Sequence, residues 1–195
     1  MIAPLQANDA ALDFLLTQRS RPAKTLKGPA PDRETMTKLL TAAARTPDHG
    51  KLEPWRFMVL ERAALDRLAV AVEARGKELG IDPDKLAKAV AEYANSPLAV
   101  VVVSAPKPSE KIPQIEQVYS AGAVCLALVN ASLAAGWGAN WLSGWATHDE
   151  TFRKSAFGLS EDERIAGVIH IGTEGAVPPE RPRPDVAALT TWVEA

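Results

Sequence analysis

Residues 98–103 read Leu-Ala-Val-Val-Val-Val, an uninterrupted apolar run that ends in four β-branched side chains. A strand with one solvated face alternates apolar and polar residues, so an unbroken run is typical of a strand covered on both faces. Two further stretches, Trp55–Leu60 and Arg164–Ile171, have the composition of strands. The sequence therefore predicts a sheet with packed layers on both sides.

Helical patterns occupy most of the sequence around these strands. Asn8 or Asp9, Asp32 and Asp82 are suited to cap three of the helices. Three or four strands are too few for every helix to be a crossover of a parallel sheet, so we expect one α+β layered domain over residues 1–195. The predicted helices run from Asn8 or Asp9 into Arg19–Arg21, from Asp32 to about Arg45, over Arg62–Leu79 and Pro83–Asn95, from about Pro113 to Ala135, and over Asp149–Phe157.

Two segments have compositions that predict their surroundings. The helix from Pro113 to Ala135 is rich in small residues, so we expect it to be buried nearly all round, with Cys125 acting as a small hydrophobe. A short segment around Trp137–Trp141 then leads into a loop. The tail contains four prolines and ends in the apolar stretch Val186–Val193, so we expect it to lie over a second subunit.

Composition and charge exclude several classes of function. A formal net charge of −2 gives no strong field to attract nucleic acid or an anionic membrane. The single cysteine excludes an internal disulfide and a cysteine-rich zinc site. The first residues, MIAPLQANDAALDFLL, lack the features of a secretory signal, so we expect a cytoplasmic protein without a membrane span.

A search for catalytic motifs finds little. There is no P-loop, and Gly136-Trp137-Gly138 follows a helix rather than joining a strand to one. His49, His148 and His170 lie far apart without metal-ligand spacing, so each is best interpreted as a surface or core histidine. Ser143 lacks the paired glycine of a nucleophile elbow.

Three separated segments are more informative: Gln18–Arg21, Arg45–Phe57 and Gly136–Trp145, followed by Ile171-Gly172-Thr173 and Arg181-Pro182-Arg183-Pro184. Their order and spacing resemble FMN-dependent nitroreductases, especially a compact subgroup with a Pro-Asp-His loop. The resemblance covers almost the whole chain. It implies a nitroreductase-like fold with a mostly antiparallel central sheet flanked by helices, a long central helix, and a tail that wraps a dimer partner. It also implies FMN at the interface of a homodimer.

The resemblance assigns one set of residues to the FMN phosphate and the pyrimidine edge of the flavin. Arg19 and Ser20 match the second and third positions of an Arg-Arg-Ser motif, and Gln18 replaces its first arginine. Arg181 and Arg183 match a basic pair near the family's C-terminus and are expected to compensate for Gln18. Guanidinium groups bind phosphate in a bidentate manner. The alternative for this pair is a solvated tail.

A second set is expected around the flavin ring. Arg45 and His49 match positions that contact FMN from the other subunit, where a cation would stabilise the anionic reduced flavin. Arg45 also suits a helix C-terminus, and the two roles are compatible. Leu142, Ser143 and Gly144 align with a segment whose backbone amides hydrogen-bond the flavin near N5. Lys51 and Glu53 stand where many members have Asn and Gln, a departure that bears on substrate choice.

The function implied by the resemblance is a ping-pong oxidoreductase. NADH or NADPH would reduce FMN, leave, and be replaced by an electron-poor acceptor such as a nitroaromatic or a quinone. This reaction requires no protein nucleophile, which agrees with the scarcity of catalytic motifs in the sequence. Two alternatives stay open: the same fold with another flavin reaction, such as flavin fragmentation or reductive dehalogenation, or a flavin-binding or scaffold protein without turnover.

Overall fold

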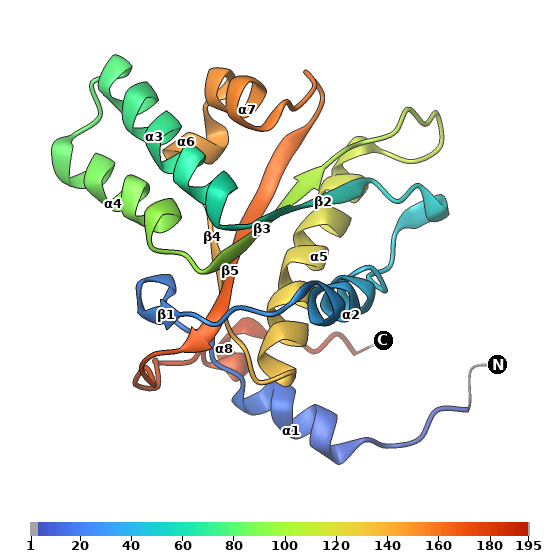
Figure 1. The fold of residues 1–195 in the computed structure, drawn as a ribbon. Coiled ribbons are helices and arrows are strands. Elements are labelled where there is room, and N and C mark those ends of the chain that lie inside the picture. Colours follow the sequence, from blue (N-terminus) through green and yellow to red (C-terminus); the bar gives the residue numbers. More distant parts are fainter. Residues whose placement is uncertain (1–3, 195) are drawn as a thin grey trace.

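The computed structural model describes residues 4–194 and contains a mostly antiparallel sheet flanked by helices (Figure 1). The strand order is β1-β5-β3-β2, and β4 also pairs with β5. Each of these pairings is antiparallel, which confirms the expected α+β architecture with a mostly antiparallel sheet. The strands are β1 (Leu26–Lys27), β2 (Trp55–Leu60), β3 (Leu98–Ser104), β4 (Gly138–Leu142) and β5 (Arg164–Glu174).

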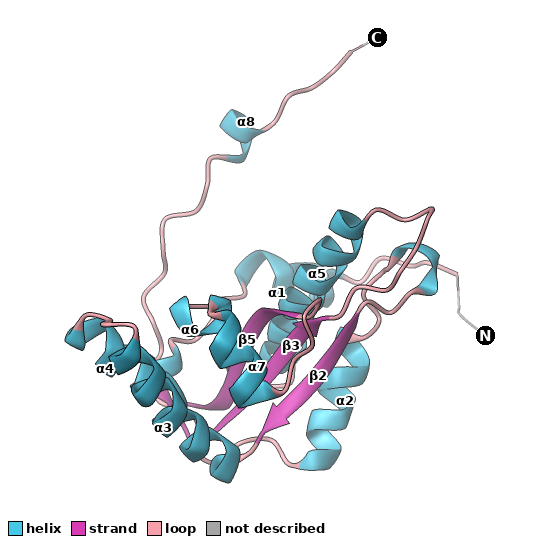
Figure 2. Cartoon of the chain, turned by 90° about the horizontal axis from the view of Figure 1, so that it is seen from above, coloured by secondary structure: helices cyan, strands magenta, loops and turns pink. Residues whose placement is uncertain are grey.

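Strand β3 lies at the centre of the hydrophobic core. All seven of its residues are buried, as the run of valines predicts. Alternate side chains enter two separate core clusters, with Val101 packed among residues of α3, α4 and α7 and Val102 among residues of α2 and α5. Figure 2 shows the helices that cover the two faces of the sheet. Burying an aliphatic side chain contributes about 1.5–3 kcal/mol, so this strand is a main source of stability.

Eight α-helices are present in residues 4–194, with 3-10 turns at Ala23–Thr25 and His49–Lys51. The side chains of Asn8, Asp32 and Asp82 each accept a hydrogen bond from the backbone N–H three residues later, so the predicted caps are confirmed. The helices are α1 (Asp9–Thr17), α2 (Arg33–Ala43), α3 (Arg62–Glu78), α4 (Pro83–Ala94), α5 (Gln114–Ala134), α6 (Trp145–His148), α7 (Glu150–Phe157) and α8 (Val186–Leu189).

Two predictions about element ends were wrong, whereas α2 ends at Ala43, close to the predicted end near Arg45. Helix α1 ends at Thr17 and does not continue into Arg19–Arg21. The segment around Trp137–Trp141 forms most of strand β4, and the short helix α6 follows it. Strand β4 depends on a partner far away in the sequence, because it becomes a regular strand only by pairing with β5.

Helix α5 is not buried nearly all round, so this prediction was wrong. One face packs on the sheet through residues such as Val124, Cys125 and Leu128, and burial raises the pKa of the Cys125 thiol to about 12. The other face leaves four large apolar side chains 44–68% exposed: Ile115, Val118, Tyr119 and Leu126. Small residues such as Ala and Ser suit contact with the sheet, but they do not reveal whether the opposite face is covered.

Helix α5 is also the one helix in residues 4–194 with the length and composition to cross a membrane, at a mean hydropathy of 1.4. The core helix of a globular protein has the same properties, and α5 packs against α2, β3, β4 and β5. Its apolar character is therefore explained by its position on the sheet.

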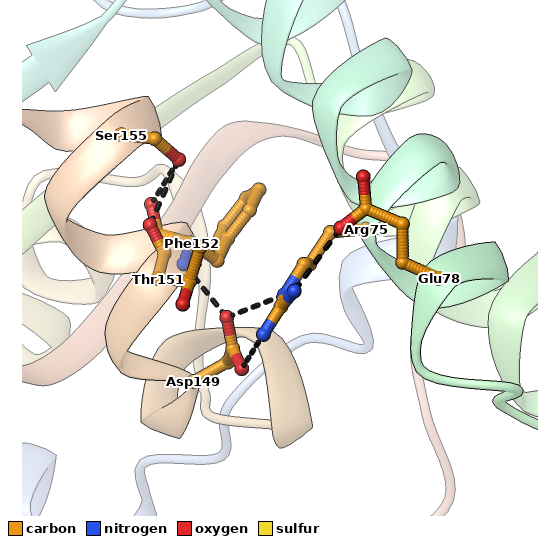
Figure 3. A network of polar contacts seen from close by, with 6 residues as sticks. All are labelled: Arg75, Glu78, Asp149, Thr151, Phe152 and Ser155. Carbon is orange, nitrogen blue, oxygen red and sulfur yellow. Dashed lines mark hydrogen bonds and ion pairs between the residues drawn. The ribbon is translucent and has the colours of Figure 1, made fainter.

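A polar network joins α3 to the region that follows β4 (Figure 3). The Asp149 carboxylate caps α7 by accepting from Phe152 N at 2.7 Å, and it accepts from Arg75 Nε and Nη2 at 3.0 and 2.9 Å. Arg75 also pairs with Glu78. Hydrogen bonding from Arg75 lowers the pKa of Asp149. Because α6 ends just before Asp149, this network anchors the chain five residues after Gly144.

Replacing Glu163 with glutamine should make the stability of the folded protein depend less on pH in the acid range. Glu163 accepts from Arg56 at 2.6 and 3.0 Å, and these bonds lower its pKa from 4.5 to about 2. A folded pKa below the unfolded one stabilises the protein above the unfolded value, and this stabilisation is lost as pH falls toward the folded pKa. We expect E163Q to melt at a lower temperature at pH 7 and to lose less stability between pH 5 and pH 2. Parallel thermal-melting profiles for the two proteins would contradict this.

Candidate functional site

A pocket of about 230 Å³ gathers residues from both ends of the chain. Gln18, Arg19 and Ser20 follow α1, whereas Arg181 and Arg183 belong to the tail, and all five line this pocket. Residues of α5 and β4 complete the lining: Leu126, Val129, Asn140 and Trp141. The structure thus brings together the five residues that were predicted to bind the phosphate and the pyrimidine edge.

The donors in this pocket are suited to an anion. Arg19 Nη1 donates to the backbone oxygen and to Oγ of Ser20 at 3.0 and 3.1 Å, whereas its Nε is buried without a partner among residues 4–194. Arg183 Nη2 donates to the Gln18 carbonyl at 3.3 Å, which ties the tail to the end of α1. A buried donor without a partner is costly, so a ligand that accepts from Arg19 would be favoured here.

The charge of the pocket matches a phosphate monoester. Glu180 accepts from Arg183 Nε and from the Arg181 backbone N–H, both at 2.9 Å, and these groups lower its pKa. The guanidinium groups of Arg19, Arg181 and Arg183 line this pocket, and the carboxylate of Glu180 pairs with one of them. Together these four groups carry an excess of two positive charges. A phosphate monoester carries about −1.5 to −2 at pH 7. The residues present therefore fit the phosphate end of FMN.

A second pocket of about 460 Å³ shares one lining residue, Asn140, with the first. Asn140 Nδ2 donates to the Arg21 carbonyl at 2.8 Å, so this side chain fixes the turn after α1 beside β4. The second pocket is mainly apolar and is bordered by Leu142 from β4 and by residues of α4. A phosphate site that shares a lining residue with an apolar pocket suits an elongated ligand that has a charged end and a flat aromatic end.

The predicted Leu142–Gly144 segment borders two pockets. Leu142 lines the 460 Å³ pocket, Gly144 lines a smaller one of about 190 Å³, and Ser143 between them is exposed. Lys88 and Glu92 of α4 line both of these pockets. No sequence motif identifies these two residues, because on a charged, Ala-rich helix nothing distinguishes them from solvated side chains.

Glycine at 167 gives Trp141 its place on the sheet. A Cβ atom at this position would overlap the Trp141 indole, so the ring lies directly over the β5 backbone. Trp141 lines the 230 Å³ pocket and is 40% exposed. Trp141 therefore forms part of the wall of this pocket.

The loop at 46–54 has an unusual backbone. Gly50, Lys51 and Glu53 all have positive φ angles, of 71°, 55° and 46°, although only the first is a glycine. Asp48 Oδ2 accepts from the Glu53 N–H at 2.8 Å and holds the loop in this shape. Non-glycine residues in this region are uncommon and often mark functional segments.

His49 and Arg45 do not reach the phosphate pocket of their own chain. His49 Nδ1 lies 2.6 Å from Glu116 Oε2, near the start of α5, and Arg45 is exposed after α2. Glu116 and Leu126 are ten residues apart on α5, which places them roughly 15 Å apart along the helix axis. Contact of Arg45 and His49 with FMN stays a prediction that requires a second copy of the chain.

His170 is a histidine of the core. His170 is buried, its Nδ1 lies 2.9 Å from Ser96 Oγ, and burial lowers its pKa to about 4. It is therefore a neutral core histidine at pH 7. Residues 4–194 contain no group of three His, Cys, Asp or Glu side chains that could hold a metal ion.

A family model and two known protein sequences that resemble this chain all concern nitroreductases. Residues 19–173 match the model of the nitroreductase family. YdjA of Escherichia coli (strain K12), provisionally named as an NAD(P)H nitroreductase, is 35% identical over 163 residues, which cover 84% of this chain and 87% of YdjA. A Haemophilus influenzae protein with a similar provisional name is 36% identical over 165 residues, covering 84% of this chain and 88% of that protein.

Solved structures show the same fold. A nitroreductase-like family protein from Bacillus cereus superposes with a TM-score of 0.77 at 20% identity, covering 100% of both chains. A provisionally named nitroreductase from Desulfovibrio desulfuricans, crystallised in complex with FMN, gives a TM-score of 0.73 at 17% identity and covers 97% of this chain and 100% of that one.

Proposed function

Because this chain belongs to the nitroreductase family, we propose that it is an FMN-dependent oxidoreductase that passes electrons from NADH or NADPH to an electron-poor acceptor such as a nitroaromatic or a quinone. The observation that carries this proposal is the pocket lined by Arg19, Arg181 and Arg183, in which the buried Nε of Arg19 has no partner among residues 4–194. Glu180, which pairs with Arg183, offsets one of the three positive charges. The adjoining apolar pocket at Asn140 is suited to a flat ring.

The roles of the residues follow from their chemistry. Arg19, Ser20, Arg181 and Arg183 would bind the phosphate through charge-assisted hydrogen bonds. Leu142–Gly144 would place main-chain donors at the ring, and the absence of a side chain at Gly144 allows a ligand to approach the backbone closely. Bound FMN supplies the two-electron chemistry, while these side chains orient it and set the surrounding charge.

We further propose that the protein forms a homodimer through α5. Ile115, Val118, Tyr119 and Leu126 form an exposed apolar stripe along this helix, and α1 has no buried residue although it carries Leu12, Leu15 and Leu16. Contiguous exposed apolar surface of this kind is typical of an interface. A second copy is the favoured partner, because a two-fold axis lets the same patch cover itself.

Two α5 helices that pack antiparallel would complete the site. Gly122 and Ala123 lie midway between Glu116 and Val129, so an axis at this point would set the start of one helix against the second half of the other. That arrangement would carry the partner's His49 and Arg45 toward the pocket bordered by Leu126 and Val129. The small side chains at the midpoint would allow close contact between the helices.

The tail supports the same proposal. Figure 2 shows that the chain runs away from the body of the protein after β5 and that α8 stands apart. Val186, Leu189, Trp192 and Val193 are each at least 72% exposed. Apolar residues on an extended segment gain stability only when they are covered, and we propose that the second copy covers them.

The proposal is tested by the absorbance spectrum of freshly purified protein. We expect a flavin spectrum that is bleached anaerobically by NADH or NADPH and restored by a nitroaromatic or a quinone. A flavin-bound protein that is inert toward both nucleotides would favour another flavin reaction, such as fragmentation or dehalogenation. A colourless protein that does not take up FMN would favour a scaffold and would overturn the proposal.

A further inference from the structure

One acidic side chain of α4 faces the pockets around the Leu142–Gly144 segment. Glu92 lines the 460 Å³ pocket together with Leu142 and the 190 Å³ pocket together with Gly144. These two residues flank Ser143 in the segment that the proposed function places at the flavin ring. Glu92 therefore borders the proposed ring position at two points.

The surroundings of Glu92 do not neutralise it. The Glu92 side chain is partly buried, none of residues 4–194 forms an ion pair with it, and burial raises its pKa above 4.5. A partly desolvated acid without a partner is unfavourable for stability, and such groups concentrate at functional sites. Trp145 lines the smaller pocket as well, and its Nε1 is buried without a hydrogen-bond partner in residues 4–194.

The other charged or titratable groups near Glu92 come from four elements. Burial raises the pKa of Tyr93 and lowers that of His170 to about 4, so both are neutral at pH 7. Arg62 donates hydrogen bonds to the backbone carbonyls of Tyr93 and Ser96. The remaining groups are exposed lysines of the pocket walls, Lys24 from the turn after Pro22 and Lys85 and Lys88 from α4.

We propose that Glu92 tunes the redox potential of FMN, its carboxylate making the reduced cofactor less favourable in this pocket. The inference rests on the proposed function. Reduction adds negative charge to the ring unless a proton accompanies the electrons, and a fixed carboxylate nearby repels that charge. One unit charge about 10 Å away, at an effective dielectric constant of about 20, changes an equilibrium on the order of tenfold. When Glu92 is protonated, the repulsion disappears.

The experiment measures midpoint potentials of FMN-loaded protein by anaerobic dye-coupled reduction. At pH 8, E92Q should favour reduced over oxidised FMN about tenfold more than the wild type does, which raises the potential by about 30 mV for a two-electron couple. Lys88→Gln should shift the potential in the opposite direction, because it removes a cation from the same pockets. The E92Q shift should shrink as the pH falls, because the wild-type carboxylate becomes protonated and burial raises its pKa.

Glu73→Gln is the matched control, because Glu73 is an exposed acid on α3 that pairs with Lys77 and lines neither pocket. An E92Q potential indistinguishable from that of E73Q at pH 8 would overturn the inference and leave the proposed function standing. A shift that stays undiminished as the pH is lowered would also overturn it. A wild-type protein that does not take up FMN would overturn both.

Discussion

Replacing Arg19 with alanine is expected to weaken FMN binding by roughly tenfold to a hundredfold and to leave riboflavin binding nearly unchanged. Arg19 is partly buried, bonds to Ser20, and has a buried Nε with no partner among residues 4–194. A hydrogen bond to a charged group contributes about 1.5–3 kcal/mol, and each 1.4 kcal/mol is a factor of ten in affinity. The two affinities are measured by quenching of flavin fluorescence.

Riboflavin provides the internal control, since it has the ring but lacks the phosphate. Arg164→Ala is a suitable control variant, because Arg164 is exposed at the start of β5 and lines neither pocket that adjoins Asn140. If R19A lost affinity for riboflavin as strongly as for FMN, the assignment of this pocket to the phosphate would be wrong.

Replacing Val118 with aspartate is expected to convert the dimer into monomers that do not retain FMN. Val118 lies on the exposed face of α5 and is 44% exposed, so the change should not disturb the core of one chain. A dimer would bury the new carboxylate twice about the two-fold axis, which is strongly unfavourable. Light scattering coupled to gel filtration measures the mass, and circular dichroism reports whether the helices remain.

Val70→Asp is the matched control, because it introduces the same change at a valine of α3 that is 69% exposed. This variant should remain dimeric and yellow. A V118D protein that stayed dimeric would show that α5 is not the interface, and a monomer that retained FMN at wild-type affinity would show that one chain completes the site.

Local sequence patterns were sufficient for the parts of the fold with short-range causes. The valine run of β3 is buried on both faces, and Asn8, Asp32 and Asp82 cap helices because capping involves only the next few residues. Strand β4 could not be predicted in this way. Its Trp141 fits on the sheet only because Gly167 of β5, which is distant in sequence, leaves room for the indole.

Helix α5 shows a second limit. An apolar composition predicts that a helix is covered, but it does not say which molecule covers it. Leu128 is covered by the chain itself, whereas Tyr119 is 68% exposed in a single copy. The sequence pattern is the same for both kinds of contact, so the expectation of nearly complete burial failed for one chain.

Sequence motifs identified some residues of the candidate site and not others. Motif positions identified Arg19, Ser20 and the tail arginines, and the structure gathers them because Arg183 reaches the Gln18 carbonyl. Asn140 and Glu92 were missed, since their importance comes from the pockets they line. Binding of FMN by any of these residues stays a prediction.

A mixed dimer tests the shared site most directly. One chain carries Arg19→Ala and the other carries both Arg45→Ala and His49→Ala, with different affinity tags so that the heterodimer can be isolated. If each site combines groups from two copies, the heterodimer contains one intact and one doubly impaired site. We therefore expect each parent homodimer to bind FMN weakly and the heterodimer to bind one FMN per dimer with wild-type affinity. A heterodimer that binds as weakly as its parents would contradict a site shared between two chains.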